Sequence, residues 1–255
     1  MNGALVTFRK ELLSYFYSPV SWIVLVAFYS WRGLELYALT YQYAFFRLDP
    51  DLLPSGSYGL TSTFWMVMLV PGVLTMRCFA EERRTGSIEV LMTAPVRDAE
   101  VVLGKWLAAA VFFAVLWLPS VVVLWALQGD AYLGADLSFG PVFAAYLGMF
   151  LISGMFLAFG CFASSLTDNV LLAALLAIMF DLAFMRGPSE LAAQLGDAAQ
   201  NYYVRELLQK IDVMNNFGQW FARGLIDTSQ VAFYLGGIAF FLFLTWTSLA
   251  TRRVA

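Results

Sequence analysis

Charge is concentrated in one stretch of this chain, Arg77-Cys78-Phe79-Ala80-Glu81-Glu82-Arg83-Arg84-Thr85-Gly86-Ser87-Ile88-Glu89-Val90-Leu91-Met92-Thr93-Ala94-Pro95-Val96. It lies between two apolar runs, Phe64–Met76 and Val101–Leu127, each long enough to enter a bilayer. A charged side chain costs about 3 kcal/mol or more at the centre of a bilayer. The stretch is therefore predicted to belong to a solvated hairpin, residues 77–100, that joins two membrane spans.

The composition indicates a membrane protein. Of the 255 residues, 61% are hydrophobic and only 13% are charged, whereas a soluble domain is about 25% charged. The apolar residues come in separate blocks of about 17–25, the length of a membrane-spanning helix. The predicted fold class is all-α: one polytopic membrane domain, 1–255, with six transmembrane helices. The predicted spans are 20–39, 62–76, 101–127, 141–162, 170–185 and 231–249.

Several function classes are excluded or disfavoured by the residues present. The chain has no histidine, which removes histidine metal sites, Ser-His-Asp triads and imidazole proton relays. A net charge of −3 argues against nucleic acid as a partner. Gly104-Lys105 is not a phosphate-binding loop, because Ala99 stands where that motif needs glycine and Trp106 where it needs serine or threonine. Cys78 and Cys161 form no CxxC motif and are predicted to be packed free thiols.

The hairpin also carries a family resemblance. Its order of elements is Glu-Glu-Arg-Arg-Thr-Gly-Ser-Ile-Glu from Glu81, then Thr-Ala-Pro-Val, then Leu103-Gly104-Lys105. This order resembles the type-2 class of ABC transporter permeases, most closely the branch of the gliding-motility and nitrous-oxide-reductase-maturation permeases. The segment Phe-Ala-Arg-Gly-Leu-Ile-Asp before the last span is similar to the same branch. The resemblance implies that the hairpin docks on a separate ATPase subunit.

A short coupling helix is predicted inside the hairpin. Gly86 breaks the preceding helix, Ser87 can cap a new one, and Glu89 falls in its first turn, where the helix dipole favours negative charge. Its apolar side would be buried in an ATPase groove; the alternative is an amphipathic loop helix lying on lipid. The predicted coupling residues are Glu81, Glu82, Arg83, Arg84, Gly86, Ser87, Ile88, Glu89, Leu91 and Met92.

An amphipathic N-terminal helix is predicted over residues 2–18. Its apolar stripe is Leu5, Phe8, Leu12 and Phe16, with Arg9, Lys10 and Glu11 off that stripe. Ser18-Pro19 is expected to end this helix, because proline disfavours helix in the residue before it. The helix is either an anchor at the membrane surface or, as the family resemblance favours, an elbow that braces the ATPase interface.

Three ionisable residues inside the predicted spans are candidates for a functional role. Arg32 and Glu35 share one face of the first span. They are either an ion pair that reaches the outer interface or a polar lining of a substrate path. Asp181 is expected near the outer end of the fifth span, about one turn from water, as a second pathway candidate.

The distribution of basic residues predicts the topology. About nine lysines and arginines fall on the side of the hairpin and both termini, and about five on the other side, mostly in one long loop, 186–230. By the positive-inside rule the termini are cytoplasmic and that loop is external. The predicted location is the bacterial inner membrane.

The leading functional hypothesis is a transmembrane subunit of an ABC transporter that exports a substrate or transmits mechanical work. The predicted partners are two copies of an ABC ATPase, a second permease subunit, identical or related, a periplasmic partner, and membrane lipid. No cofactor is expected in this chain, because ATP and Mg²⁺ would bind the ATPase, and the chain itself is not expected to be an enzyme. The alternatives are a passive channel or a structural assembly subunit, and, less favoured, an intramembrane enzyme.

Overall fold

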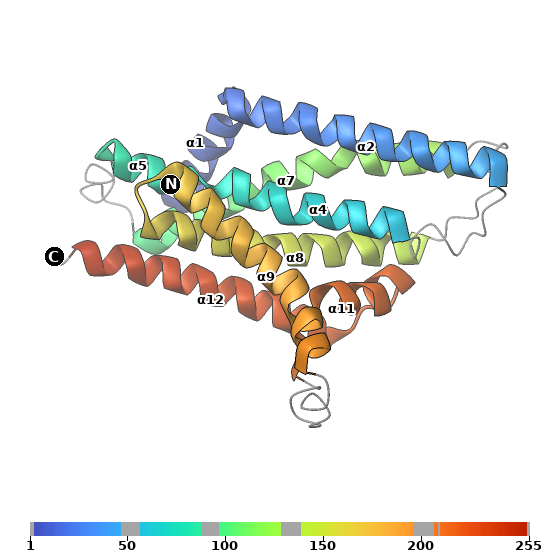
Figure 1. Cartoon of the computed structure of the whole chain (residues 1–255). Coiled ribbons are helices and arrows are strands. Elements are labelled where there is room, and N and C mark those ends of the chain that lie inside the picture. Colours follow the sequence, from blue (N-terminus) through green and yellow to red (C-terminus); the bar gives the residue numbers. More distant parts are fainter. Residues whose placement is uncertain are drawn as a thin grey trace.

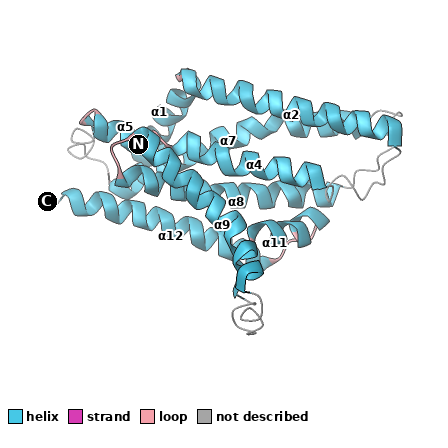
Figure 2. Cartoon of the chain, in the orientation of Figure 1, coloured by secondary structure: helices cyan, strands magenta, loops and turns pink. Residues whose placement is uncertain are grey.

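The protein is described from a computed structural model that covers residues 3–46, 57–87, 97–128, 139–195, 207–208 and 210–253. Every regular element within these residues is a helix (Figure 2). The elements are α1 (Gly3–Tyr17), α2 (Pro19–Phe46), α4 (Ser57–Thr75), α5 (Ala80–Arg84), α7 (Asp98–Gln128), α8 (Phe139–Leu166), α9 (Val170–Leu195), α11 (Val213–Gln219), the 3-10 helix η2 (Phe221–Arg223) and α12 (Thr228–Arg253).

The long helices form one bundle that is able to cross a membrane several times. Five helical stretches within the described residues are long and apolar enough to span a bilayer. A bent pair, α1 with the first part of α2, brings the number to six if it counts as one span. The chain is thus an all-helical, multi-pass membrane protein. The assignment of individual residues to the bilayer stays a prediction.

Helix α8 lies at the centre of the bundle, where it packs against α4, α7, α9, α12 and η2 (Figure 1). Small residues on α8 allow the neighbouring helices to approach it closely. A side chain at Gly160 would overlap Thr75 of α4, and one at Gly148 would overlap Phe221 of η2. Glycine at these two positions therefore fixes how closely α4 and η2 approach the central helix.

The chain turns sharply between α1 and α2, as the proline at position 19 predicts. The two helices meet at 67°. Ser18 is the only residue between them, and the following proline disfavours a helical backbone conformation at Ser18. Helix α1 then packs along α7. Helix α1 begins, α12 ends and α5 lies at one end of the bundle, which we call the hairpin end (Figure 1).

Several helix bounds differ from those expected from the sequence. Helix α2 runs on to Phe46, beyond the expected span 20–39, and α9 runs on to Leu195, through the expected start of the loop 186–230. Helix α9 continues through Pro188, although an internal proline removes a backbone hydrogen bond and its ring clashes with a carbonyl of the preceding turn. Asn169 caps α9: its side-chain oxygen accepts from the backbone N–H of Leu171 at 3.0 Å.

The segment between α9 and α12 folds back on the bundle. Phe217 and Phe221 of this segment are both buried. Phe217 meets Phe64 of α4 edge to face at 5.2 Å between ring centroids. Gly224, at φ 80°, ends η2 and lets the backbone pass close to Pro141. The end of the bundle opposite the hairpin is therefore closed partly by this segment.

Candidate functional site

The first turn of the hairpin is held by the end of α8. The Oγ of Ser164 accepts hydrogen bonds from the backbone N–H groups of Phe79 and Ala80, both at 3.0 Å. The same hydroxyl donates to the carbonyl of Met76 at 3.2 Å. One side chain of α8 thus serves polar groups at the start of α5 that α5 cannot pair by itself.

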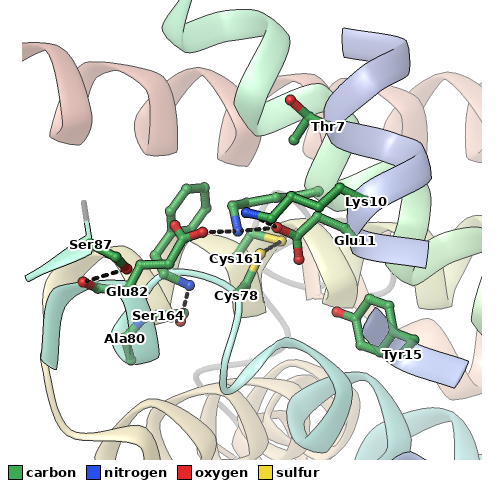
Figure 3. A network of polar contacts seen from close by, with 12 residues as sticks. Thr7, Lys10, Glu11, Tyr15, Cys78, Ala80, Glu82, Ser87, Cys161 and Ser164 are labelled. Atoms are coloured by element: carbon green, nitrogen blue, oxygen red, sulfur yellow. Dashed lines mark hydrogen bonds and ion pairs between the residues drawn. The ribbon is translucent and has the colours of Figure 1, made fainter. Parts of the chain in front are cut away.

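A buried lysine joins the hairpin to two other helices. The side chain of Lys105, on α7, is only 2% exposed. Its Nζ donates to Oε1 of Glu11 on α1 and to Oε1 of Glu82 on α5, each at 2.9 Å (Figure 3). The ammonium also lies 5.2 Å from the centre of the Phe79 ring, a favourable cation–π distance. We call Glu11, Glu82 and Lys105 the ionic cluster.

The ionic cluster is short of positive charge. One ammonium faces two carboxylates, and Oε2 of Glu82 is buried without a hydrogen-bond partner. Lys10 lies 3.9 Å from Glu11, but its side chain is 67% exposed and contributes little. Removing one partner of such a buried arrangement is costly, because the remaining charges lose their compensation. The position of the hairpin therefore depends strongly on Lys105.

Three further contacts connect helices at the hairpin end, close to the ionic cluster. A Cβ atom at Gly104 would lie 2.9 Å from the carbonyl oxygen of Ala4, so glycine allows α1 to lie directly on α7. Tyr15 of α1 donates to the carbonyl of Leu74 at the end of α4 at 3.0 Å. Arg83 donates to the carbonyl of Ser165 in α8. Helices α1, α4, α5, α7 and α8 are thus connected within a few turns at the hairpin end.

The expectation that the hairpin is solvated throughout is wrong at its base. Phe79 and Ala80 are fully buried, and the charged Glu82 points into the bundle, because Lys105 compensates its charge there. Glu81 stays partly exposed, 3.9 Å from Arg77.

The rest of the predicted coupling residues divide into two groups. Arg84, Gly86 and Ser87 are exposed, and Gly86 has a φ of 73°, which agrees with its expected role as a break. Ser87 shares a hydrogen bond at 3.0 Å with the Thr85 hydroxyl. The remaining residues, Ile88, Glu89, Leu91 and Met92, lie outside the described residues.

Sequence reasoning missed the partners of Glu82. Glu11 was expected on the polar side of α1, yet it faces Lys105. Lys105 was considered only as part of a family motif and of a rejected phosphate-binding loop. A stronger indication was available: Lys105 falls inside a predicted span, and a lysine inside a span requires a partner or access to water.

The pathway candidates lie on two helices, Arg32 and Glu35 on α2 and Asp181 on α9. The guanidinium of Arg32, on α2, lies 4.9 Å from the centre of the Trp117 ring on α7. Glu35 is also in α2, but its side chain falls outside what the structure describes. Asp181 of α9 was expected about one turn from water, but it is 0% exposed. Neither of its carboxylate oxygens has a hydrogen-bond partner.

The described residues hold no group of three or more histidine, cysteine or acidic side chains that could bind a metal ion. The family model of the ABC-2 family transporter proteins matches residues 6–251. The chain belongs to the ABC-2 family. No curated protein matches its sequence. Proteins of this family are membrane subunits of transporters that generally work with an ABC ATPase, which makes the ionic cluster and hairpin of this ABC-2 protein its candidate functional site.

Proposed function

We propose that this chain is the transmembrane subunit of an ABC transporter of the bacterial inner membrane, coupled through its hairpin to a separate ATPase. Family membership supports the transporter assignment. The observation that carries the coupling role is the ionic cluster, in which Lys105 of α7 holds both Glu82 of the hairpin and Glu11 of α1. Because Lys105 contacts Glu82 directly, a displacement of the hairpin would move α7 through the ionic cluster.

The coupling element of the proposal is the segment from about Ser87 to Thr93. It follows the end of α5 and the break at Gly86, where Arg84 and Gly86 are exposed. A helix this short is not stable alone in water, because isolated helices under about 12 residues are marginal. The helix therefore needs a partner surface. Its apolar residues Ile88, Leu91 and Met92 can bind in a groove of the ATPase.

The complete transporter would contain two permease subunits, identical or related, and two copies of the ATPase. A pair of permeases places the path between them and gives the assembly closed symmetry. Arg32, Glu35 and Asp181 remain the candidates for polar contacts along that path. The buried state of Asp181 supports a role, because an ionisable side chain inside a membrane bundle is costly to keep.

Two outputs fit this assembly: export of a substrate, and transmission of force to a periplasmic partner. The second is suggested by the resemblance to the gliding-motility and nitrous-oxide-reductase-maturation permeases. In both cases cytoplasmic termini and a cytoplasmic hairpin are required, and the location of α1, α5 and the end of α12 at the same end of the bundle supports that arrangement (Figure 1).

The substitution Leu91→Asp tests the coupling element. A charge buried without a partner costs several kcal/mol, and each 1.4 kcal/mol weakens binding about tenfold. We expect the variant to insert in the membrane normally, to lose co-purification with the ATPase that accompanies the wild-type chain, and to lose ATP turnover in the reconstituted complex.

The matched control is Leu207→Asp, the same change at an exposed leucine in the predicted external segment. It should leave both ATPase binding and turnover at wild-type levels. Unchanged binding and turnover in Leu91→Asp would show that this segment is not the coupling element. Equal losses in both variants would show that the effect comes from general damage to the chain.

A further inference from the structure

Two cysteines meet at the base of the hairpin. Cys78 lies in the turn between α4 and α5, and Cys161 lies in α8, 83 positions later in the sequence. Their Sγ atoms are 3.5 Å apart, and Figure 3 shows both thiols beside Glu11. Both thiols are free and buried, with exposures of 6% and 0%. They are the only two cysteines of the chain.

The approach of the two thiols is fixed by contacts on either side. One residue before Cys161, the absence of a side chain at Gly160 lets Thr75 of α4 lie against α8. Three residues after Cys161, Ser164 holds the backbone of Phe79 and Ala80. A disulfide bond is about 2.0 Å long, so the sulfur atoms need to approach by only about 1.5 Å, through side-chain rotation and a small shift of the turn.

We propose that Cys78 and Cys161 are an oxidation site that closes into an intrachain disulfide and ties the turn of the hairpin to α8. The site itself needs only this chain and a small neutral oxidant of the peroxide class. A second consequence, that the closed site stops transport, rests on the proposed function, because it requires the hairpin to move relative to α8 during the ATPase cycle.

The reaction with a peroxide balances without another reactant. The thiolate of Cys78, the less buried of the two residues, attacks one peroxide oxygen. The O–O bond breaks, leaving a sulfenic acid on Cys78 and releasing hydroxide. The thiolate of Cys161 then attacks the Cys78 sulfur; the S–O bond breaks, the S–S bond forms and a second hydroxide leaves. The two hydroxides take up the two thiol protons. Two thiols and hydrogen peroxide become one disulfide and two waters, and a thiol reductant reverses the change.

The first experiment treats the reduced, purified chain with hydrogen peroxide, blocks remaining thiols with a maleimide under denaturing conditions, and measures its mass without reductant. We expect a monomer that has lost two hydrogens, takes up no maleimide, and yields one linked pair of peptides containing Cys78 and Cys161. Reductant should restore two reactive thiols. The Cys161→Ala variant should instead keep Cys78 either free or carrying oxygen, with no intrachain link.

Two results would overturn the oxidation site. One is a wild-type chain that still takes up two maleimides after peroxide treatment, as expected for buried thiols that act only as small apolar side chains. The other is oxygen added to each cysteine separately without a link. Both results are independent of the transporter assignment, because the measurement uses no ATPase and no substrate.

The second experiment measures ATP-driven activity of the reconstituted complex before and after oxidation. Oxidised wild type should lose most of its activity and regain it with reductant, whereas a Cys78→Ala/Cys161→Ala variant should be insensitive to peroxide. A link that forms without changing activity would refute the consequence for transport, and with it hairpin movement against α8, while the oxidation site would stand on the first experiment.

Discussion

Replacing Lys105 by methionine tests the ionic cluster most directly. Methionine keeps an unbranched side chain of similar length but removes the ammonium that compensates Glu11 and Glu82, each 2.9 Å away. Breaking a buried pair costs about 3–5 kcal/mol because the remaining charges are left uncompensated. Both glutamate side chains are 17% exposed, so water screens part of this cost and the lower value, about 3 kcal/mol, applies.

This cost should be visible as a loss of thermal stability. For chains of about 150–250 residues, each kcal/mol shifts the melting temperature by about 2–4 °C. The Lys105→Met variant should therefore melt roughly 6–12 °C below the wild type in the same detergent. The assay is the fraction of monodisperse protein that survives heating, followed by size-exclusion chromatography.

Two controls separate charge from packing. Lys10→Met removes a lysine that is also near Glu11 but 67% exposed, and it should leave the melting temperature unchanged. Adding Glu11→Gln and Glu82→Gln to Lys105→Met should recover most of the lost stability. Replacing a whole buried ionic group by uncharged residues often changes the stability very little. A Lys105→Met variant as stable as wild type, or a triple variant no better than the single one, would refute the reasoning.

Three other predictions follow from the same structure. In a cysteine-free background, cysteine at Ser189 should react with a membrane-impermeant maleimide in intact cells, while cysteine at Thr85 should not; the opposite pattern would invert the topology. Leucine at both Arg32 and Glu35 should reduce transport without lowering the yield of the complex, and full transport would remove the pair from the proposed path. Leucine at Gly104 should push α1 away from α7, at a cost of about 1–3 kcal/mol for overpacking, and should raise hydrogen exchange across α1.

The glycine prediction has a control on the neighbouring helix. Gly33 of α2 has no atom within 4 Å of the place where a Cβ would stand, so leucine there should leave exchange in α1 unchanged. Equal exchange in the Gly104 variant and in wild type would show that α1 does not depend on this close approach.

Much of the fold could be predicted from local sequence features. Long apolar runs specify the helices, since a membrane requires all backbone groups to be paired within a segment. The bend at Pro19 and the break at Gly86 could be predicted as well, because each depends on the backbone preference of one residue. The end of α9 was misplaced because a proline inside a helix usually breaks it, whereas α9 continues through Pro188 with residues 189–194 exposed.

The candidate site could be predicted only in part. The charge density of the hairpin marked its location, but the inward orientation of Glu82 depends on residues that are distant in the sequence. Lys105 is 23 positions from Glu82, and Glu11 is 94 positions from Lys105. A charged residue on an amphipathic helix usually faces water, so local periodicity placed Glu11 on the wrong side. Nothing local to Ser164 indicates that it holds the start of α5.

The distance in sequence between Ser164 and the turn it holds has a consequence for biosynthesis. Phe79 and Ala80 are translated more than eighty residues before the serine whose hydroxyl accepts their amide hydrogens, at separations of 85 and 84 positions. Lys105 is available much earlier, so on the nascent chain the hairpin can meet its ionic partner while its amide groups still lack their acceptor. The hairpin can reach its final form only once the fourth long apolar helix has emerged from the ribosome and inserted. Chains stalled or truncated before that point should present an unfinished hairpin to the chaperones and proteases that survey membrane insertion, and so be degraded.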